Sequence, residues 1–212
     1  NKKKVYRLCK ELDILRPQSK IKKHHPRKLA KREEINSSNQ LWEMDLKYGY
    51  INETDEFFFQ LSVIDVFDRN IISYHLGLSC KAKDACRVLK DALAKRKLTK
   101  GMDLPTIRTD NGPQFISKAF GHTCKALGLK HQRIPVKTPN MNAHIESFHS
   151  ILERDCYKIN EFKSYIHVYE VVSKYMNYYN NRYRHGSLGD KSPADFYQAI
   201  QEKTIKPEPF IA

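Results

Sequence analysis

Three acidic residues, far apart in the sequence, could together hold divalent metal ions. Asp45 lies in WEMDLKYGY, Asp110 lies in RTDNGPQF and Glu146 lies in NAHIESFHS. Carboxylate oxygens are the ligands that Mg²⁺ and Mn²⁺ prefer, and magnesium keeps positions open for water or substrate phosphates. Two such ions about 4 Å apart can activate an attacking oxygen and stabilise the departing one in a phosphodiester displacement. The acids therefore indicate a candidate site for phosphoryl transfer with two ions.

Each acid also has a structural reading that the sequence leaves open. Asp110, Asn111 and Gly112 are residue types that favour turns, because Asn and Gly tolerate positive φ and Asp hydrogen-bonds nearby backbone. A chain of 212 residues contains many acids, so other parts of the sequence must decide between a turn and a metal ligand.

The elements that would position the first acid are predicted to be three antiparallel strands. They are rich in β-branched and aromatic residues: LWEMDLKYGYI (41–51), FFFQLSVIDVF (57–67) and NIISYHLGL (70–78). Alternation in the first strand directs Asp45 away from Trp42. If the hairpin turns about Thr54, Asp45 lies opposite Val63 and diagonal to Asp65 on the same face.

Helices and strands then alternate along the chain. Apolar spacing predicts a helix from Ala82 to Leu93, a strand at 104–109, a helix at 118–129, a strand at 130–136 and a helix at 138–157. This order predicts an α/β sheet covered by helices. Asp110 would end a strand at the sheet edge where ligands commonly bind, and Glu146 would lie on a polar helix flank with Asn142 and His149. Tyrosines and valines at 165–179 are expected to pack in the core.

The chain carries a formal net charge of +14, which suggests a polyanionic partner such as nucleic acid. Residues 1–32 hold 13 basic and 2 acidic side chains, so most of the excess charge lies in a basic arm. The arm is either a solvated linker or a DNA-contacting segment, and the two readings are compatible. The five cysteines show no zinc spacing and are expected to be reduced, and no apolar run approaches a membrane span. We expect a cytoplasmic protein that does not contact a membrane.

The motifs WEMD, VIDVFDR, RTDNGPQF and NAHIESFHS, with 35 residues between Asp110 and Glu146, closely resemble the catalytic core of retroviral integrases and bacterial DDE transposases. The run YYNNRYRHGSL followed by SPADF resembles the OrfB-type transposases of the third insertion-sequence family. The resemblance covers about residues 41–200. It implies a ribonuclease H-like fold, with a mixed five-stranded sheet flanked by helices. It also implies a DNA strand transferase that uses Mg²⁺ or Mn²⁺.

By motif, the resemblance implies that Asp45, Asp110 and Glu146 are the catalytic metal ligands. Water would cleave the element's end, and the freed 3′-hydroxyl would attack target DNA. Synapsis of two DNA ends implies a homodimer or a larger oligomer. Relatives usually carry a basic residue where this chain has Glu153, with Arg154 one position later, and they commonly carry Asp where it has Met141.

Other candidate residues surround the three acids in this reading. Asn111 and His149 are expected to support the ligands without binding metal themselves, and Asp65 is expected to have either such a supporting role or a structural one. Contacts with DNA are assigned to Lys47, Asn142, Arg154, Arg182, Arg184 and His185. Lys47 could equally pair with an acid, His149 could make only a surface hydrogen bond, and Arg182 to His185 could cap a helix.

The sequence predicts four segments. Residues 1–15 would be the end of a truncated helix-turn-helix region, 16–40 a basic linker arm, 41–200 the catalytic core and 201–212 a tail. Two alternatives to a transposase core stay open. One is a DNA-binding or assembly module without catalysis, and the other is a metal-dependent nuclease that acts on a different substrate.

Overall fold

The computed structural model describes residues 1–15, 33–135, 139–206 and 208–212. Most of the predicted basic arm, and the ends of the strand and helix expected to meet at 136–138, lie outside these ranges. The strands are β1 (Glu34–Ile35), β2 (Leu41–Ile51), β3 (Glu56–Asp65), β4 (Ile71–Gly77), β5 (Thr106–Thr109), β6 (Lys130–Arg133) and β7 (Phe210–Ile211).

The helices alternate with the later strands, as predicted. They are α1 (Lys2–Glu11), α2 (Ala82–Lys95), α3 (Pro113–Ile116), α4 (Lys118–Leu127), α5 (Ala143–Leu152), α6 (Tyr165–Asn181) and α7 (Pro193–Gln201). Short turns η1 (Pro139–Asn142) and η2 (Glu153–Tyr157) flank α5, and η3 (Gly186–Leu188) precedes α7. The helix expected at 138–157 is therefore divided into a 3₁₀ turn, an α-helix and a π-helical turn.

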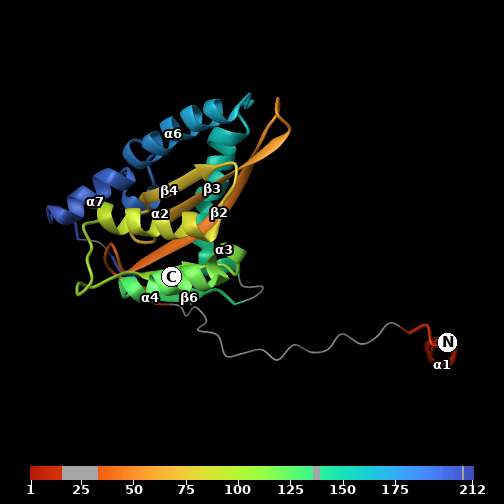
Figure 1. Ribbon diagram of the computed structural model, residues 1–212. Coiled ribbons are helices and arrows are strands. Elements are labelled where there is room, and N and C mark those ends of the chain that lie inside the picture. The colour runs from red at the N-terminus through yellow and green to blue at the C-terminus, as the bar shows by residue number, and fades with distance from the viewer. Residues whose placement is uncertain (16–32, 136–138, 207) are drawn as a thin grey trace.

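Within the described ranges, five strands form one mixed sheet in the order β4-β3-β2-β5-β6, which we call the main sheet. The first three strands are antiparallel, whereas β5 and β6 run parallel to β2. Figure 1 shows β2 and β3 as a long ribbon that extends past the other strands. The predicted α/β sheet with three leading antiparallel strands is confirmed.

Helices cover both faces of the main sheet (Figure 1). Trp42 and Met44 of β2 point into a core built with α2, α3 and α4. The opposite core lies under α5 and α6 and includes Phe148 and Tyr179. The predicted stripe at 165–179 packs in this second core through its buried residues Val168, Val172, Met176 and Tyr179, although Tyr169 is exposed.

The register of the β2–β3 hairpin differs from the prediction by one residue. Asp45 pairs with Ser62, and Trp42 pairs with Asp65. The prediction that Asp45 lies opposite Val63 was wrong, because the hairpin turns between residues 53 and 54. Since a slip of one residue moves a side chain to the other face, Asp65 lies on the side of Trp42 and not on the side of Asp45.

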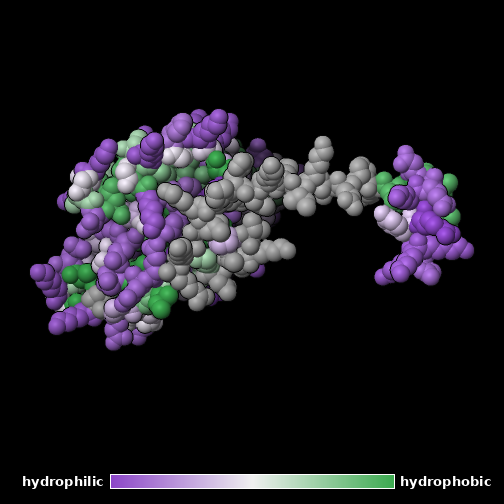
Figure 2. All heavy atoms as spheres, turned by 90° about the horizontal axis from the view of Figure 1, so that it is seen from below, coloured by the Kyte–Doolittle hydropathy of each residue, from purple (hydrophilic) through white to green (hydrophobic). Residues whose placement is uncertain are grey.

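The chain's end contributes to the fold, which the sequence did not indicate. β7 pairs with β1 in a small second sheet, and the Phe210 ring stacks on the Phe67 ring with 6.1 Å between the ring centroids. None of the helices in the described ranges combines the length and apolar character needed to cross a bilayer. The coloured residues on the face shown in Figure 2 are mostly hydrophilic, with scattered apolar patches.

Candidate functional site

The strand register directs the two candidate aspartates to the same side of the main sheet. β2 and β5 are parallel, with Glu43 paired to Arg108 and Met44 paired to Thr109. The next position along this register joins Asp45 to Asp110, and paired residues on neighbouring strands point to one face. Asp110 follows the last residue of β5 at its carboxyl end, as predicted.

Glu146 comes to this side from α5. It lies in the first turn of the helix, and its side chain is exposed. On the same helix, His149 Nδ1 lies 3.5 Å from Asp45 Oδ2, so α5 runs beside the carboxylate of Asp45. The three acids thus lie on the same side of the main sheet, on β2, the β5–α3 turn and α5.

The electrostatics of Asp45 reflect this arrangement. Burial, together with the negative charges of Asp110, Glu146 and Glu43, raises the pKa of Asp45 to about 7, although a hydrogen bond from the Leu46 N–H acts in the opposite direction. Burial and the Glu43 charge also raise the pKa of Glu146. Acids that disfavour each other's ionisation are typical of sites that bind cations.

The chemistry of this donor set suits Mg²⁺ or Mn²⁺, because all three side chains offer carboxylate oxygens. As the side chains stand in the described ranges, however, no three His, Cys, Asp or Glu residues are close enough to hold an ion jointly. Ionisation of Asp45 beside two other acids is costly without a cation. A bound cation would offset this cost, so the charges of the site favour cation binding.

The turn that carries Asp110 is fixed by its own hydrogen bonds. Asp110 Oδ1 accepts from the Gly112 N–H at 2.9 Å, which confirms the turn reading of the sequence. Asn111 Nδ2 donates to the Ile134 carbonyl at 2.9 Å and so fastens the turn to the end of β6. A Cβ at Gly112 would lie 3.0 Å from the Asp110 carboxylate and 2.6 Å from the Gln114 side chain, which explains glycine there.

His149 is the predicted neighbour that contacts an acid. Burial and nearby Lys47 lower the pKa of His149 to about 3, so its ring is neutral at physiological pH. A neutral imidazole beside Asp45 can donate one hydrogen bond and adds no positive charge to the site.

Asp65, by contrast, has a structural part on the other face. Its carboxylate accepts from the Asn39 and Phe67 N–H groups and from Trp42 Nε1 at 2.7, 2.8 and 3.1 Å. The prediction that Asp65 lies beside Asp45 was wrong, because the hairpin register places it with Trp42.

Two predicted DNA contacts are wholly or partly buried in this structure. Asn142, which directly precedes α5, is only 1% exposed. His185 is partly buried against the rings of Tyr179 and Tyr183. Burial and the charge of Arg69 lower the pKa of His185 to about 4, so it offers no positive charge at neutral pH.

The basic residues predicted to contact DNA differ in whether their side chains already pair with acidic residues. Lys47 Nζ forms an ion pair with Glu153 Oε2 at 2.7 Å. Arg154 is held by both oxygens of Asp155 at 2.6 and 2.8 Å. Arg182 and Arg184 are exposed after the end of α6, and Arg184 donates to the Asp190 carbonyl at 3.0 Å.

The sequence analysis missed two functional candidates, Glu43 and Arg108. Both are fully buried, and they lie two residues before Asp45 and Asp110. Alternation already placed Glu43 on the face of Asp45, but only the parallel pairing of β2 with β5 shows that Arg108 is its partner.

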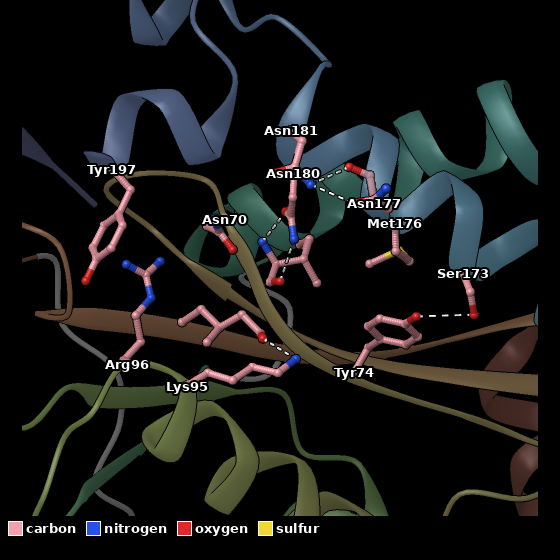
Figure 3. A pocket seen from close by; sticks show the side chains of 12 residues that line it. Asn70, Tyr74, Lys95, Arg96, Ser173, Met176, Asn177, Asn180, Asn181 and Tyr197 are labelled. Carbon is pink, nitrogen blue, oxygen red and sulfur yellow. Dashed lines mark hydrogen bonds between the residues drawn. The ribbon is translucent and has the colours of Figure 1, made fainter. Parts of the chain in front are cut away.

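A hollow of about 650 Å³ lies near Asp45 and is lined by Lys47, His149, Glu153 and Tyr157 among others. A separate hollow of about 430 Å³ lies at the β4 edge of the main sheet, between β4, α2 and α6 (Figure 3), and none of the candidate acids lines it.

Comparison with known proteins identifies family models and relatives that are similar to this chain. A family described as integrase core domain matches residues 36–139, and a second one of the same description matches residues 127–193. The chain is 28% identical over 208 residues to the transposase for insertion sequence element IS904 of Lactococcus lactis, which covers 92% of this chain and 80% of the relative. It is 30% identical over 160 residues to transposase InsF for insertion sequence IS3A of Escherichia coli, covering 74% of this chain and 54% of that protein.

A third relative is an uncharacterized 39.2 kDa protein of insertion element IS476 from Xanthomonas euvesicatoria, 29% identical over 200 residues. This match covers 92% of the chain and 55% of that relative, so the chain spans little more than half of its length.

Solved structures share the fold. A simian T-cell lymphotropic virus intasome structure gives a TM-score of 0.62 at 19% identity, covering 82% of this chain and 59% of that chain. The HTLV-2 integrase catalytic core domain in complex with magnesium gives 0.54 at 16% identity, covering 76% and 97%. The predicted ribonuclease H-like fold is confirmed by these neighbours. The chain belongs to the integrase core domain family, together with transposases of bacterial insertion sequences.

Proposed function

We propose that this chain is the catalytic region of a transposase that cleaves DNA at the ends of an insertion element and joins the freed 3′-hydroxyl to target DNA. The observation that carries the proposal is that Asp45, Asp110 and Glu146 lie on one side of the main sheet. The negative charges of Asp110 and Glu146, which raise the pKa of Asp45, also support it.

Asp45, Asp110 and Glu146 would hold two Mg²⁺ or Mn²⁺ ions. When bound, such ions lower the pKa of an attacking hydroxyl and stabilise the charge on the departing oxygen. The magnesium complex of the HTLV-2 core, a structural neighbour, supports a divalent ion in this fold. His149 would orient the Asp45 carboxylate, and Asn111 would keep the Asp110 turn in place.

Contacts with DNA phosphates would come from Lys47, Arg154, Arg182 and Arg184, together with the basic arm. Arg182 and Arg184 are exposed. Lys47 and Arg154 would first have to break their ion pairs with Glu153 and Asp155, respectively, before they could bind phosphate. An assembly of at least two copies is also part of the proposal, because two element ends must be joined together. The HTLV-2 core, which has dimeric and trimeric forms, supports it.

Replacement of Asp110 tests the proposed function. Asp110→Asn retains an oxygen that can accept from the Gly112 N–H, so the turn is expected to persist while the charge is lost. End cleavage and strand joining on duplexes that carry the element's ends should fall by on the order of 10³-fold or more in Mg²⁺. Asp103→Asn, at an exposed acid before β5, is the matched control and should retain activity.

The products separate the alternatives. Nicked but never joined strands would favour a nuclease, and metal-independent DNA binding by an inactive wild type would favour a module without catalysis. Full activity of Asp110→Asn would refute the proposed site.

A further inference from the structure

We propose that the buried ion pair of Glu43 and Arg108 positions the three candidate acids, an inference that rests on the proposed function. Glu43 precedes Asp45 by two residues on β2, and Arg108 precedes Asp110 by two residues on β5. The two are register partners on adjacent parallel strands, and both side chains are 1% exposed. The pair therefore links the two strands that carry the aspartates, directly beside those aspartates.

The same carboxylate also holds the start of α5. Glu43 Oε2 accepts from the Ile145 N–H at 2.9 Å, and Oε1 lies 3.3 Å from His144 Nδ1. Ile145 is the third residue of α5, a position whose N–H is usually capped by the residue preceding the helix. Asn142 makes no such side-chain bond, so Glu43 takes over the capping from another element.

Arg108 completes the connection. Its NH1 group lies 4.0 Å from Glu43 Oε1 and donates to the Met141 carbonyl at 3.2 Å. One charged pair thus fastens β2, β5 and the first turn of α5, the elements that carry Asp45, Asp110 and Glu146. In each element the fastened residue lies within two positions of the acid.

The energetic cost of burying charges suggests that the Glu43–Arg108 pair positions the acids rather than only stabilising the fold. Transfer of two charges to a dry interior costs several kcal/mol per ion in typical proteins, and apolar side chains of similar volume often stabilise a fold more. At 4.0 Å the pair is also not in close contact. What the pair adds is a defined arrangement of three elements, which apolar packing alone specifies less strictly.

Glu43→Gln tests this inference in the full chain. The amide retains the side-chain volume and an oxygen for the Ile145 N–H, but it removes the negative charge that faces Arg108. We expect the affinity for Mn²⁺, measured by electron paramagnetic resonance of the free ion, to fall about 10- to 100-fold. The kcat of end cleavage should fall as well, while the KM for DNA stays close to that of the wild type.

Asp68→Asn is the matched control. Asp68 and Arg96 form a second buried ion pair, with 2.9 Å between Oδ2 and NH2, on the face away from the acids. Its loss should lower the melting temperature as Glu43→Gln does, but leave the Mn²⁺ affinity unchanged. If Glu43→Gln does not fold, Glu43→Asp retains the charge, shortens the reach to Ile145 and should weaken Mn²⁺ binding in the same direction.

Two results would overturn the inference: Mn²⁺ affinities of the folded Glu43 variants within twofold of the wild type, or a loss no larger than that of Asp68→Asn. A wild type whose Mn²⁺ binding does not depend on Asp110 would instead refute the proposed function. The two failures are thus distinguishable in one set of titrations.

Discussion

At the scale of single residues, Glu153 neutralises Lys47, the basic side chain of β2. Its Oε2 atom lies 2.7 Å from Lys47 Nζ, and the Lys47 side chain is only 18% exposed. The ammonium also lies 5.6 Å from the centre of the Tyr157 ring. The charge of Lys47 is therefore engaged in contacts within the protein. Lys47 lines the hollow near the candidate acids.

Glu153→Gln should release Lys47 for a phosphate. We expect the variant to bind duplex DNA a few-fold more tightly, with a salt dependence steeper by about one released counterion. Fluorescence anisotropy over a series of salt concentrations measures both quantities. Glu202→Gln, at an exposed acid that contacts Gln198, serves as the control, and equal slopes for all three proteins would contradict the expectation.

The residues of the site differ in how far the sequence alone could predict them. The alternation of side chains along a strand was enough to predict which face of the sheet Asp45 lies on. The turn-forming residue types were enough to predict the turn at Asp110. Asp65 was misplaced because hairpin composition fixes the turn only to within one residue, and one residue inverts the face. The partnership of Glu43 with Arg108 depends on the pairing of strands far apart in the sequence, which no local pattern encodes.

At the scale of elements, the division of the predicted helix at 138–157 follows from hydrogen bonding rather than composition. Apolar spacing continues through the whole segment, yet residues Glu153–Tyr157 form a π-helical turn. One extra residue in that turn changes which side chains face the sheet, so Cys156 and Tyr157 are buried and Glu153 reaches Lys47. The apolar periodicity of the sequence does not reveal such an insertion.

The outer edge of β4 is protected by side chains in place of another strand. Asn180 accepts from the Ile71 N–H and donates to the Ile71 carbonyl, both at 2.9 Å, and Lys95 donates to the Ile72 carbonyl at 3.0 Å (Figure 3). Unpaired edge groups promote association with other chains, so the amide of Asn180 satisfies the edge as a neighbouring strand would.

Asn180→Ala should lower the free energy of unfolding by about 1–3 kcal/mol, because it leaves two partly buried backbone groups without partners. Urea unfolding followed by circular dichroism gives this value. Asn181→Ala is the matched control, since Asn181 is exposed and bonds only to Asn177 of its own helix. Equal effects of the two substitutions would show that Asn180 stabilises the helix and not the strand edge.

At the scale of the whole molecule, most of the net positive charge lies in the first 32 residues of the sequence. Residues 1–32 carry a net charge of +11, and the other 180 residues carry +3. No side chain of α1 is buried, although Val5, Leu8 and Leu12 are exposed apolar residues. The first core residue after these 32 residues is Ile35, which is 1% exposed and lies within the segment predicted as the linker arm.

A chain that begins at Glu33 should therefore fold normally and bind DNA poorly. We expect its melting temperature to lie within about 2 °C of the full chain, because the removed side chains of α1 contribute nothing buried. Its affinity for duplex DNA at near-physiological salt should fall by at least about tenfold, with a shallower salt dependence, because fewer counterions are released. Calorimetry and anisotropy titrations measure the two effects, and the affinities of both chains should converge as salt is raised. Equal affinity at low salt would mean that the face of the folded body carrying Arg182 and Arg184 accounts for binding by itself.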